Sequence, residues 1–264
     1  MSADMTADND AVRGERASSS CLIAHEYVIE SVLRGSGRPG IRPSMPGLDP
    51  VVALAALFDA ERAARDAHDD LGQLGQRDPA RLLPSLEKAC REALALDDED
   101  EASLRLKCLA ELLGELDGAR VVDVLVDILG CEDAEARRAA GEALSGLAFD
   151  RFKDVALGVE RALARLPDGN PALAELPYLL AEVPEPGVSK LLARFLAHRD
   201  PDAVASAIEA LVEIGDPSAL PLLEPLAKDA RRVELEDEGG TEGDASIGEL
   251  VSEALSLLGR GASA

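Results

Sequence analysis

The amino-acid sequence predicts an all-α fold of about five stacked helical hairpins behind an N-terminal capping helix. Apolar residues make up 47% of the 264-residue chain but aromatic residues only 2%, a composition that favours closely packed helices over a β-sandwich. A short motif recurs along the chain, and Asp-Pro or Asn-Pro pairs separate its copies. We find no segment that alternates apolar and polar residues with the period of a strand, so we expect no strand.

The first 47 residues are expected to form a disordered arm, because most of them are polar. An apolar island at about 20–34 has helical spacing and predicts a short amphipathic helix before a Gly/Pro-rich linker. Two interpretations of this helix stay open. It packs back on the first repeat as a cap, or it inserts into a groove of a partner, with Ile23, Tyr27 and Leu33 as its anchors.

The next segment, residues 48–76, is predicted to be the N-terminal capping helix. Its apolar residues Val51, Leu54, Ala55 and Phe58 share one side of a helix. We expect that side to cover the end of the first repeat.

Helix starts are signalled by acidic or amide residues that precede proline. The side chain of Asp or Asn caps free backbone amides, and proline suits the first helical position because its missing N–H would be unpaired there. The pairs are Asp49-Pro50, Asp78-Pro79, Asn170-Pro171, Asp200-Pro201 and Asp216-Pro217.

Residues 77–264 carry the recurring motif and are predicted to form the repeats. Successive copies start 31, 36, 31 and 44 residues apart, and the surplus in the last interval falls on an acidic insertion at 233–244, which we expect to be a loop. This loop is either a surface excursion or a mobile docking element. Pro177, inside the third copy, is expected to kink or shorten its helix. The copies are Glu111–Leu116, Glu142–Leu147, Tyr178–Val183, Glu209–Ile214 and Glu253–Leu258.

The stretch Asp200–Leu223 resembles HEAT repeats, in particular the short bacterial form related to phycobilisome-lyase repeats. Ala205 departs from the family pattern, which has arginine there, whereas Asp133–Leu147 follows it well. The resemblance covers about 78–261. It implies a right-handed α-α superhelix, a HEAT-like solenoid, whose second helices line a concave face.

On that face the resemblance predicts a column of partner-binding residues, because the same motif position recurs on each second helix. Glutamate at this position is alternatively only a helix-favouring residue beside the buried Ala-Leu pair. The predicted column is Glu111, Glu142, Tyr178, Glu209 and Glu253, with Lys107 and Arg138 one turn earlier on the first two helices.

Charge favours a protein partner. The chain has 51 acidic and 27 basic residues and a net charge of −24, which repels nucleic acid and anionic membranes and attracts basic proteins. Alternatively, the excess of acidic residues serves only to keep the protein soluble. We expect a non-catalytic protein–protein interaction scaffold or adaptor for a basic protein partner. The alternative is a lyase-like or chaperone accessory protein for a chromophore-bearing or other client protein.

Catalytic and metal-binding patterns are not found. The histidines His25, His68 and His198 have neither each other nor a cysteine at i, i+4, and the four cysteines form no C-x-x-C pair. No apolar run approaches the ~20 residues that a membrane span needs. We therefore expect no catalytic residues, no metal, no cofactor and a cytoplasmic location.

Overall fold

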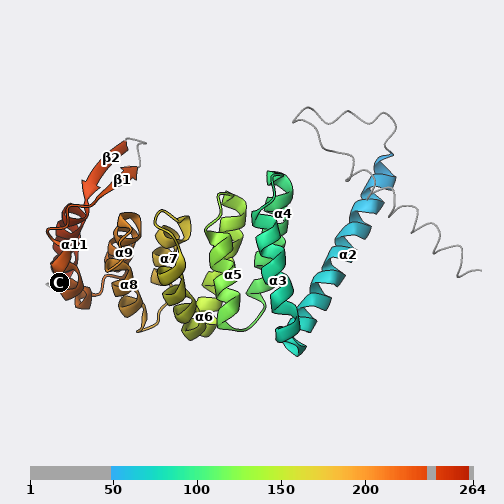
Figure 1. The fold of residues 1–264 in the computed structure, drawn as a ribbon, viewed down its shortest axis with the longest axis horizontal. Coiled ribbons are helices and arrows are strands. Elements are labelled where there is room, and N and C mark those ends of the chain that lie inside the picture. The colour runs from blue at the N-terminus through green and yellow to red at the C-terminus, as the bar shows by residue number, and fades with distance from the viewer. Residues whose placement is uncertain (1–48, 237–241, 262–264) are drawn as a thin grey trace, which may run out of the picture. The chain divides into compact units, whose positions relative to one another are not determined.

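The computed structural model describes residues 49–236 and 242–261 (Figure 1). The chain divides into two units, Met1–Leu57 and Phe58–Ala264. The predicted anchors Ile23, Tyr27 and Leu33 lie outside the described residues, so their role stays a prediction.

Ten α-helices, two short 3-10 helices and two strands make up the described part of the chain. The helices of the first hairpins and their flanking helix are α2 (Pro50–Arg77), α3 (Pro79–Leu94), α4 (Glu99–Gly114), α5 (Ala119–Leu129), α6 (Ala134–Arg165) and α7 (Pro171–Ala181). The remaining elements are α8 (Val188–Leu196), α9 (Pro201–Ile214), η1 (Pro217–Ala219), α10 (Leu220–Leu223), η2 (Glu224–Leu226), β1 (Arg232–Glu236), β2 (Glu242–Ser246) and α11 (Ile247–Gly261). None of these helices combines the length and the apolar character that a membrane crossing requires.

The second unit stacks five helical hairpins in sequence order. Each second helix packs against the second helix of the next hairpin, in the order α4, first half of α6, α7, α9 and α11. The first helices form the other layer: α3, α5, the second half of α6, α8 and the short η1–α10–η2 segment. This arrangement confirms the predicted all-α solenoid. The outward side of the second helices is called the second-helix face below.

The core lies between the two layers and consists mainly of Leu, Val, Ile and Ala. The largest side chain with no exposed surface is Phe195 on α8. Close approach of helices depends on small residues: a Cβ at Gly158 of α6 would lie 2.3 Å from Cγ1 of Val122 on α5. Few aromatic residues are therefore needed to fill the core, because the helices approach closely and aliphatic side chains fill the space between them.

All five predicted Asp/Asn-Pro starts are confirmed as helix caps. In each, a side-chain oxygen accepts a hydrogen bond from a backbone N–H two or three residues later, which satisfies a donor that the helix itself leaves unpaired. The acceptor residues are Asp49, Asp78, Asn170, Asp200 and Asp216.

The second and third hairpins are joined without a loop. α6 spans 32 residues and consists of two helical segments that meet at a kink at Arg151, whose backbone is non-helical, with φ −144° and ψ 52°. The first half of α6 completes the second hairpin and the second half begins the third. The expected effect of Pro177 is a shortening: α7 has 11 residues, three fewer than α9.

A β-hairpin replaces the predicted loop at 233–244. β1 and β2 pair antiparallel, with Arg232 opposite Ser246 and Glu236 opposite Glu242. The expectation of no strand was therefore wrong at this place. The reason is that Val233, 4% exposed, anchors the first strand in the core. The second strand has poor strand formers and is held by backbone pairing and by the ion pair of Arg232 Nε with Asp244 Oδ2 at 2.5 Å.

Only the last third of α2 packs on the first hairpin. Gly72 and Gly75 are its buried residues, and a Cβ at Gly75 would lie 2.2 Å from Cδ2 of Leu116, so glycine permits the close approach. His68 Nε2 lies 3.1 Å from Glu115 Oε1 beside this contact.

The expected covering side of α2 is exposed instead. Val51 is 74%, Leu54 50% and Phe58 55% exposed. The physical reason is that an apolar stripe shows only that one side of a helix can be covered, whereas the residues that would cover it are encoded elsewhere in the chain.

Candidate functional site: the second-helix face

The structure places the predicted column residues on successive second helices. The carboxylates and the phenol come from α4, the first half of α6, α7, α9 and α11, and every one of these residues is exposed. Recurrence of the motif therefore predicted their positions. Their role in binding a partner remains a prediction. The residues are Glu111, Glu142, Tyr178, Glu209 and Glu253.

The two predicted basic residues are already paired within the chain. Lys107 Nζ donates to Glu135 Oε2 at 3.3 Å, and Arg138 donates to Glu142 Oε1 at 2.5 Å and to Glu135 at 3.4 Å. The hydrogen bond from Lys107, followed by that from Arg138, lowers the pKa of Glu135, and the hydrogen bond to Glu142 leads the causes that raise the pKa of Arg138. This network links α4 to α6 and neutralises both cations locally.

A groove of about 480 Å³ lies between α6 and α7. Most of its charges are paired, because Arg137 Nε pairs with Glu175 Oε1 at 2.9 Å and Arg138 pairs with Glu142. Desolvation by burial raises the pKa of Glu175, partly offset by Arg137. Glu182 is the one charged residue of this lining without an ion pair among the described residues.

Tyr178 connects two hairpins. Its hydroxyl, on α7, donates to Glu209 Oε2 on α9. The residue is 40% exposed, so the edge of the ring faces solvent while the hydroxyl is engaged. Partial burial, followed by the hydrogen bond to Glu209, raises the pKa of Tyr178 to about 12.

We expect this raised pKa in a direct titration. In a Tyr27→Phe background Tyr178 is the only tyrosine, so absorbance at 295 nm reports its ionisation alone. The midpoint should lie near 12, and in Glu209→Gln it should fall only part of the way towards 10, because partial burial, the larger cause, remains. Since the folded-state pKa is raised, the associated stability is complete below pH 10 and is lost as the pH rises towards 12. An unchanged midpoint in Glu209→Gln would show that the hydrogen bond does not raise the pKa.

A second groove, of about 350 Å³, lies between α9 and α11. Its charged lining residues are Glu209, Glu213 and Glu253, and none of its lining residues is basic. Sequence analysis found two of these carboxylates through the motif. Glu213 was missed, although it lies in the same motif copy one turn after Glu209, on the same side of α9.

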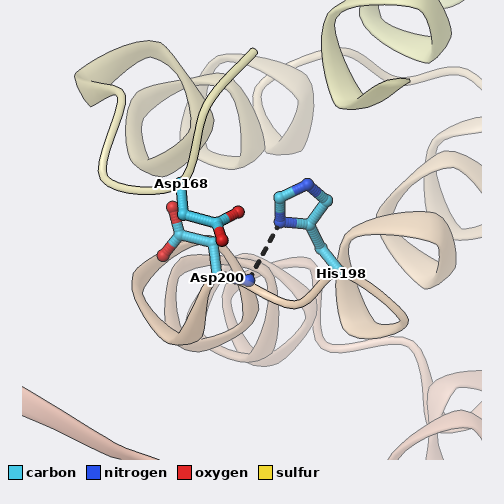
Figure 2. A group of neighbouring side chains, drawn as sticks. All are labelled: Asp168, His198 and Asp200. Atoms are coloured by element: carbon cyan, nitrogen blue, oxygen red, sulfur yellow. Dashed lines mark hydrogen bonds between the residues drawn. The ribbon is translucent and has the colours of Figure 1, made fainter. Parts of the chain in front are cut away.

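One cluster of metal-ligand residue types occurs in the described part of the chain, where the turn inside the third hairpin meets the turn inside the fourth. Ligand atoms of Asp168, His198 and Asp200 lie within 4.8 Å of one another. Figure 2 shows the imidazole beside the two carboxylates, with Nδ1 towards the backbone nitrogen of Asp200. Sequence analysis found no metal-ligand partner for His198, because spacing along one helix does not reveal neighbouring residues that come from two different turns.

Hydrogen bonds account for this cluster. Asp200 is 2% exposed, and its two oxygens accept from the backbone N–H of Asp202 at 3.0 Å and of Gly169 at 2.7 Å. His198 Nδ1 accepts from the Asp200 N–H at 3.2 Å, and Asp168 Oδ1 accepts from Arg199 Nε at 2.6 Å. Asp200 therefore caps α9 and also fixes the preceding turn, which explains why its carboxylate is buried at this place.

Comparison with known protein families supports the repeat assignment. Residues 159–236 match the family model described as HEAT repeats, a segment that contains α7, α8 and α9. This part of the chain is therefore similar to HEAT repeats. No curated protein matches it.

Among solved structures the similarities are weak. An engineered protein is 20% identical, with 74% of this chain and 90% of that chain covered and a TM-score of 0.30. A computationally designed armadillo repeat protein for modular peptide recognition is 16% identical, with 73% of this chain and 92% of that chain covered and a TM-score of 0.31. Human deoxyhypusine hydroxylase in complex with glycerol is 18% identical, with 77% of this chain and 98% of that chain covered and a TM-score of 0.24.

Proposed function

We propose that this chain is a non-catalytic interaction scaffold that holds a basic protein partner on its second-helix face. The observation that carries the proposal is the recurrence of exposed glutamates at one motif position on α4, α6, α9 and α11, in a chain of net charge −24. Such a face favours encounter with a positively charged surface. Helical repeats also bury their apolar sides against each other, which leaves the outward side free for recognition.

Charge reversal on this face tests the proposal. We expect Glu142→Lys combined with Glu209→Lys to weaken retention of partners from a host extract about tenfold or more, because two contacts become repulsive. The melting temperature should change by only a few degrees, because exposed substitutions usually alter the free energy of unfolding by less than about 0.5 kcal/mol. The matched control is Glu185→Lys with Glu224→Lys, which makes the same charge change at exposed positions outside the face.

Photo-cross-linking locates the contact independently. A benzophenone amino acid at position 209 should give adducts with the partner, whereas the same group at the exposed position 157, on the other layer, should give few. Equal retention by both charge-reversal variants, or adducts mainly from position 157, would contradict the proposed face.

A further inference from the structure

The groove between α9 and α11 combines an apolar floor with an acidic rim. Both helices are second helices of adjacent hairpins and pack side by side (Figure 1). Part of the floor is open to solvent, since Leu257 is 48% exposed, while Ile208 and Ala254 beneath are buried. The floor residues are Ile208, Val212, Leu250, Ala254 and Leu257.

The carboxylates on the rim lack cationic partners. Neither Glu213 nor Glu253 makes an ion pair or a side-chain hydrogen bond with any residue that the structure describes, and Glu209 uses only Oε2, as acceptor for the hydroxyl of Tyr178. Three negative charges thus line one opening of about 350 Å³ without a base among its walls. The three negative charges repel each other, and a cation placed between them relieves this repulsion.

The neighbouring groove shows the contrast. Between α6 and α7, Arg137 and Arg138 lie in the lining and pair with Glu175 and Glu142. The two grooves occupy the same face of the same stack, but the α6/α7 groove has two arginines against three glutamates, whereas the α9/α11 groove has three glutamates and no basic residue. Charge complementarity therefore selects that groove for a cationic ligand.

The shape of the lining favours an arginine or lysine side chain over a small ion. Such a side chain lays its apolar stem along aliphatic surface and holds its charged head at the rim. Arginine suits this groove better than lysine does, because its planar guanidinium group donates hydrogen bonds to several carboxylates at once and is weakly hydrated. An apolar neighbour in the partner then covers the exposed part of Leu257.

We infer that the α9/α11 groove binds a basic side chain of the partner protein, with an adjacent leucine-sized side chain packed on Val212, Leu250 and Leu257. This inference rests on the proposed function and assigns the charged contact to one end of the face. It commits to a protein segment that presents a guanidinium or ammonium group beside an apolar residue.

Methyl NMR of the full chain, titrated with the peptide N-acetyl-Leu-Arg-Leu-amide, tests the inference. We expect saturable shifts at the methyl groups of Val212, Leu250 and Leu257, and none at Leu179 in the α6/α7 groove. The same peptide with citrulline in place of arginine keeps the shape and loses the charge, and it should bind at least fivefold more weakly.

Two matched double variants complete the test. Glu213→Gln with Glu253→Gln should weaken binding of the arginine peptide about tenfold and leave binding of the citrulline peptide unchanged. Glu185→Gln with Glu224→Gln, at exposed positions outside the face, should change neither. Equal binding of both peptides, shifts centred on Leu179, or an unaffected Glu213/Glu253 variant would overturn the inference.

Failure of this inference and failure of the proposed function are distinguishable. If the peptide leaves the α9/α11 methyl groups unmoved while the partner still cross-links to position 209, the groove assignment falls and the scaffold face stands. If the methyl groups respond while the partner cross-links to position 157, the groove binds cations and the proposed face falls.

Discussion

Phe195→Ala should lower the free energy of unfolding by about 3–5 kcal/mol, the range for removal of a fully buried aromatic side chain. Phe195 is 0% exposed on α8, at the centre of the fourth hairpin. Its removal takes away contacts with both layers and leaves a cavity that closely packed helices fill only in part. Urea unfolding followed by circular dichroism at 222 nm measures the loss.

The matched variant is Phe195→Leu, which keeps most of the volume and should lose less than half as much. Each hairpin contacts only its neighbours in a stack of repeats, so the damage should also be local at first. Hydrogen exchange should rise earliest within 188–214. A loss below about 1 kcal/mol would mean that this part of the core is not tightly packed.

Asp200→Ala should cost about 2–3 kcal/mol, because one side chain does two tasks. It caps α9 through the Asp202 N–H, a contribution of about 1 kcal/mol in most helices, and it also accepts from the Gly169 N–H of the preceding hairpin. The carboxylate is 2% exposed, so alanine leaves polar donors without their acceptor in a poorly hydrated place. Urea unfolding midpoints at constant slope report the change.

Asp216→Ala provides the comparison. Asp216 caps η1 through the Ser218 N–H and also accepts from the Ser218 hydroxyl, and no bond from it reaches another hairpin. It should cost less than half as much as Asp200→Ala. Equal losses in the two variants would show that the bond to Gly169 contributes nothing.

The helices of this chain could be predicted from sequence because each depends on local information. Asp78, Asn170 and Asp200 cap through neighbours two or three residues away, and an apolar stripe with helical spacing needs no knowledge of the partner helix. The sequence also predicts that Glu142 and Glu209 lie on one face, because residues at the same motif position in stacked repeats lie on the same side of the stack.

The missed features depend on contacts between distant residues. Strand β2 contains Gly243 and Asp244 and forms because β1 lies opposite it. Whether Phe58 is covered depends on residues outside α2, so the apolar pattern of α2 alone does not encode its exposure. Arg138 seemed available to a partner, and only the folded chain brings Glu135 and Glu142 to it together.

The two helical segments of α6 meet at Arg151 without a loop between them. Elsewhere a turn separates consecutive hairpins, for example at 182–187 between α7 and α8. A reporter domain or a protease site inserted in such a turn needs to displace only surface backbone. An insertion at Arg151 has no loop to lengthen and would disturb the helical segments on both sides, so this junction is a poor place to cut, graft or extend the protein.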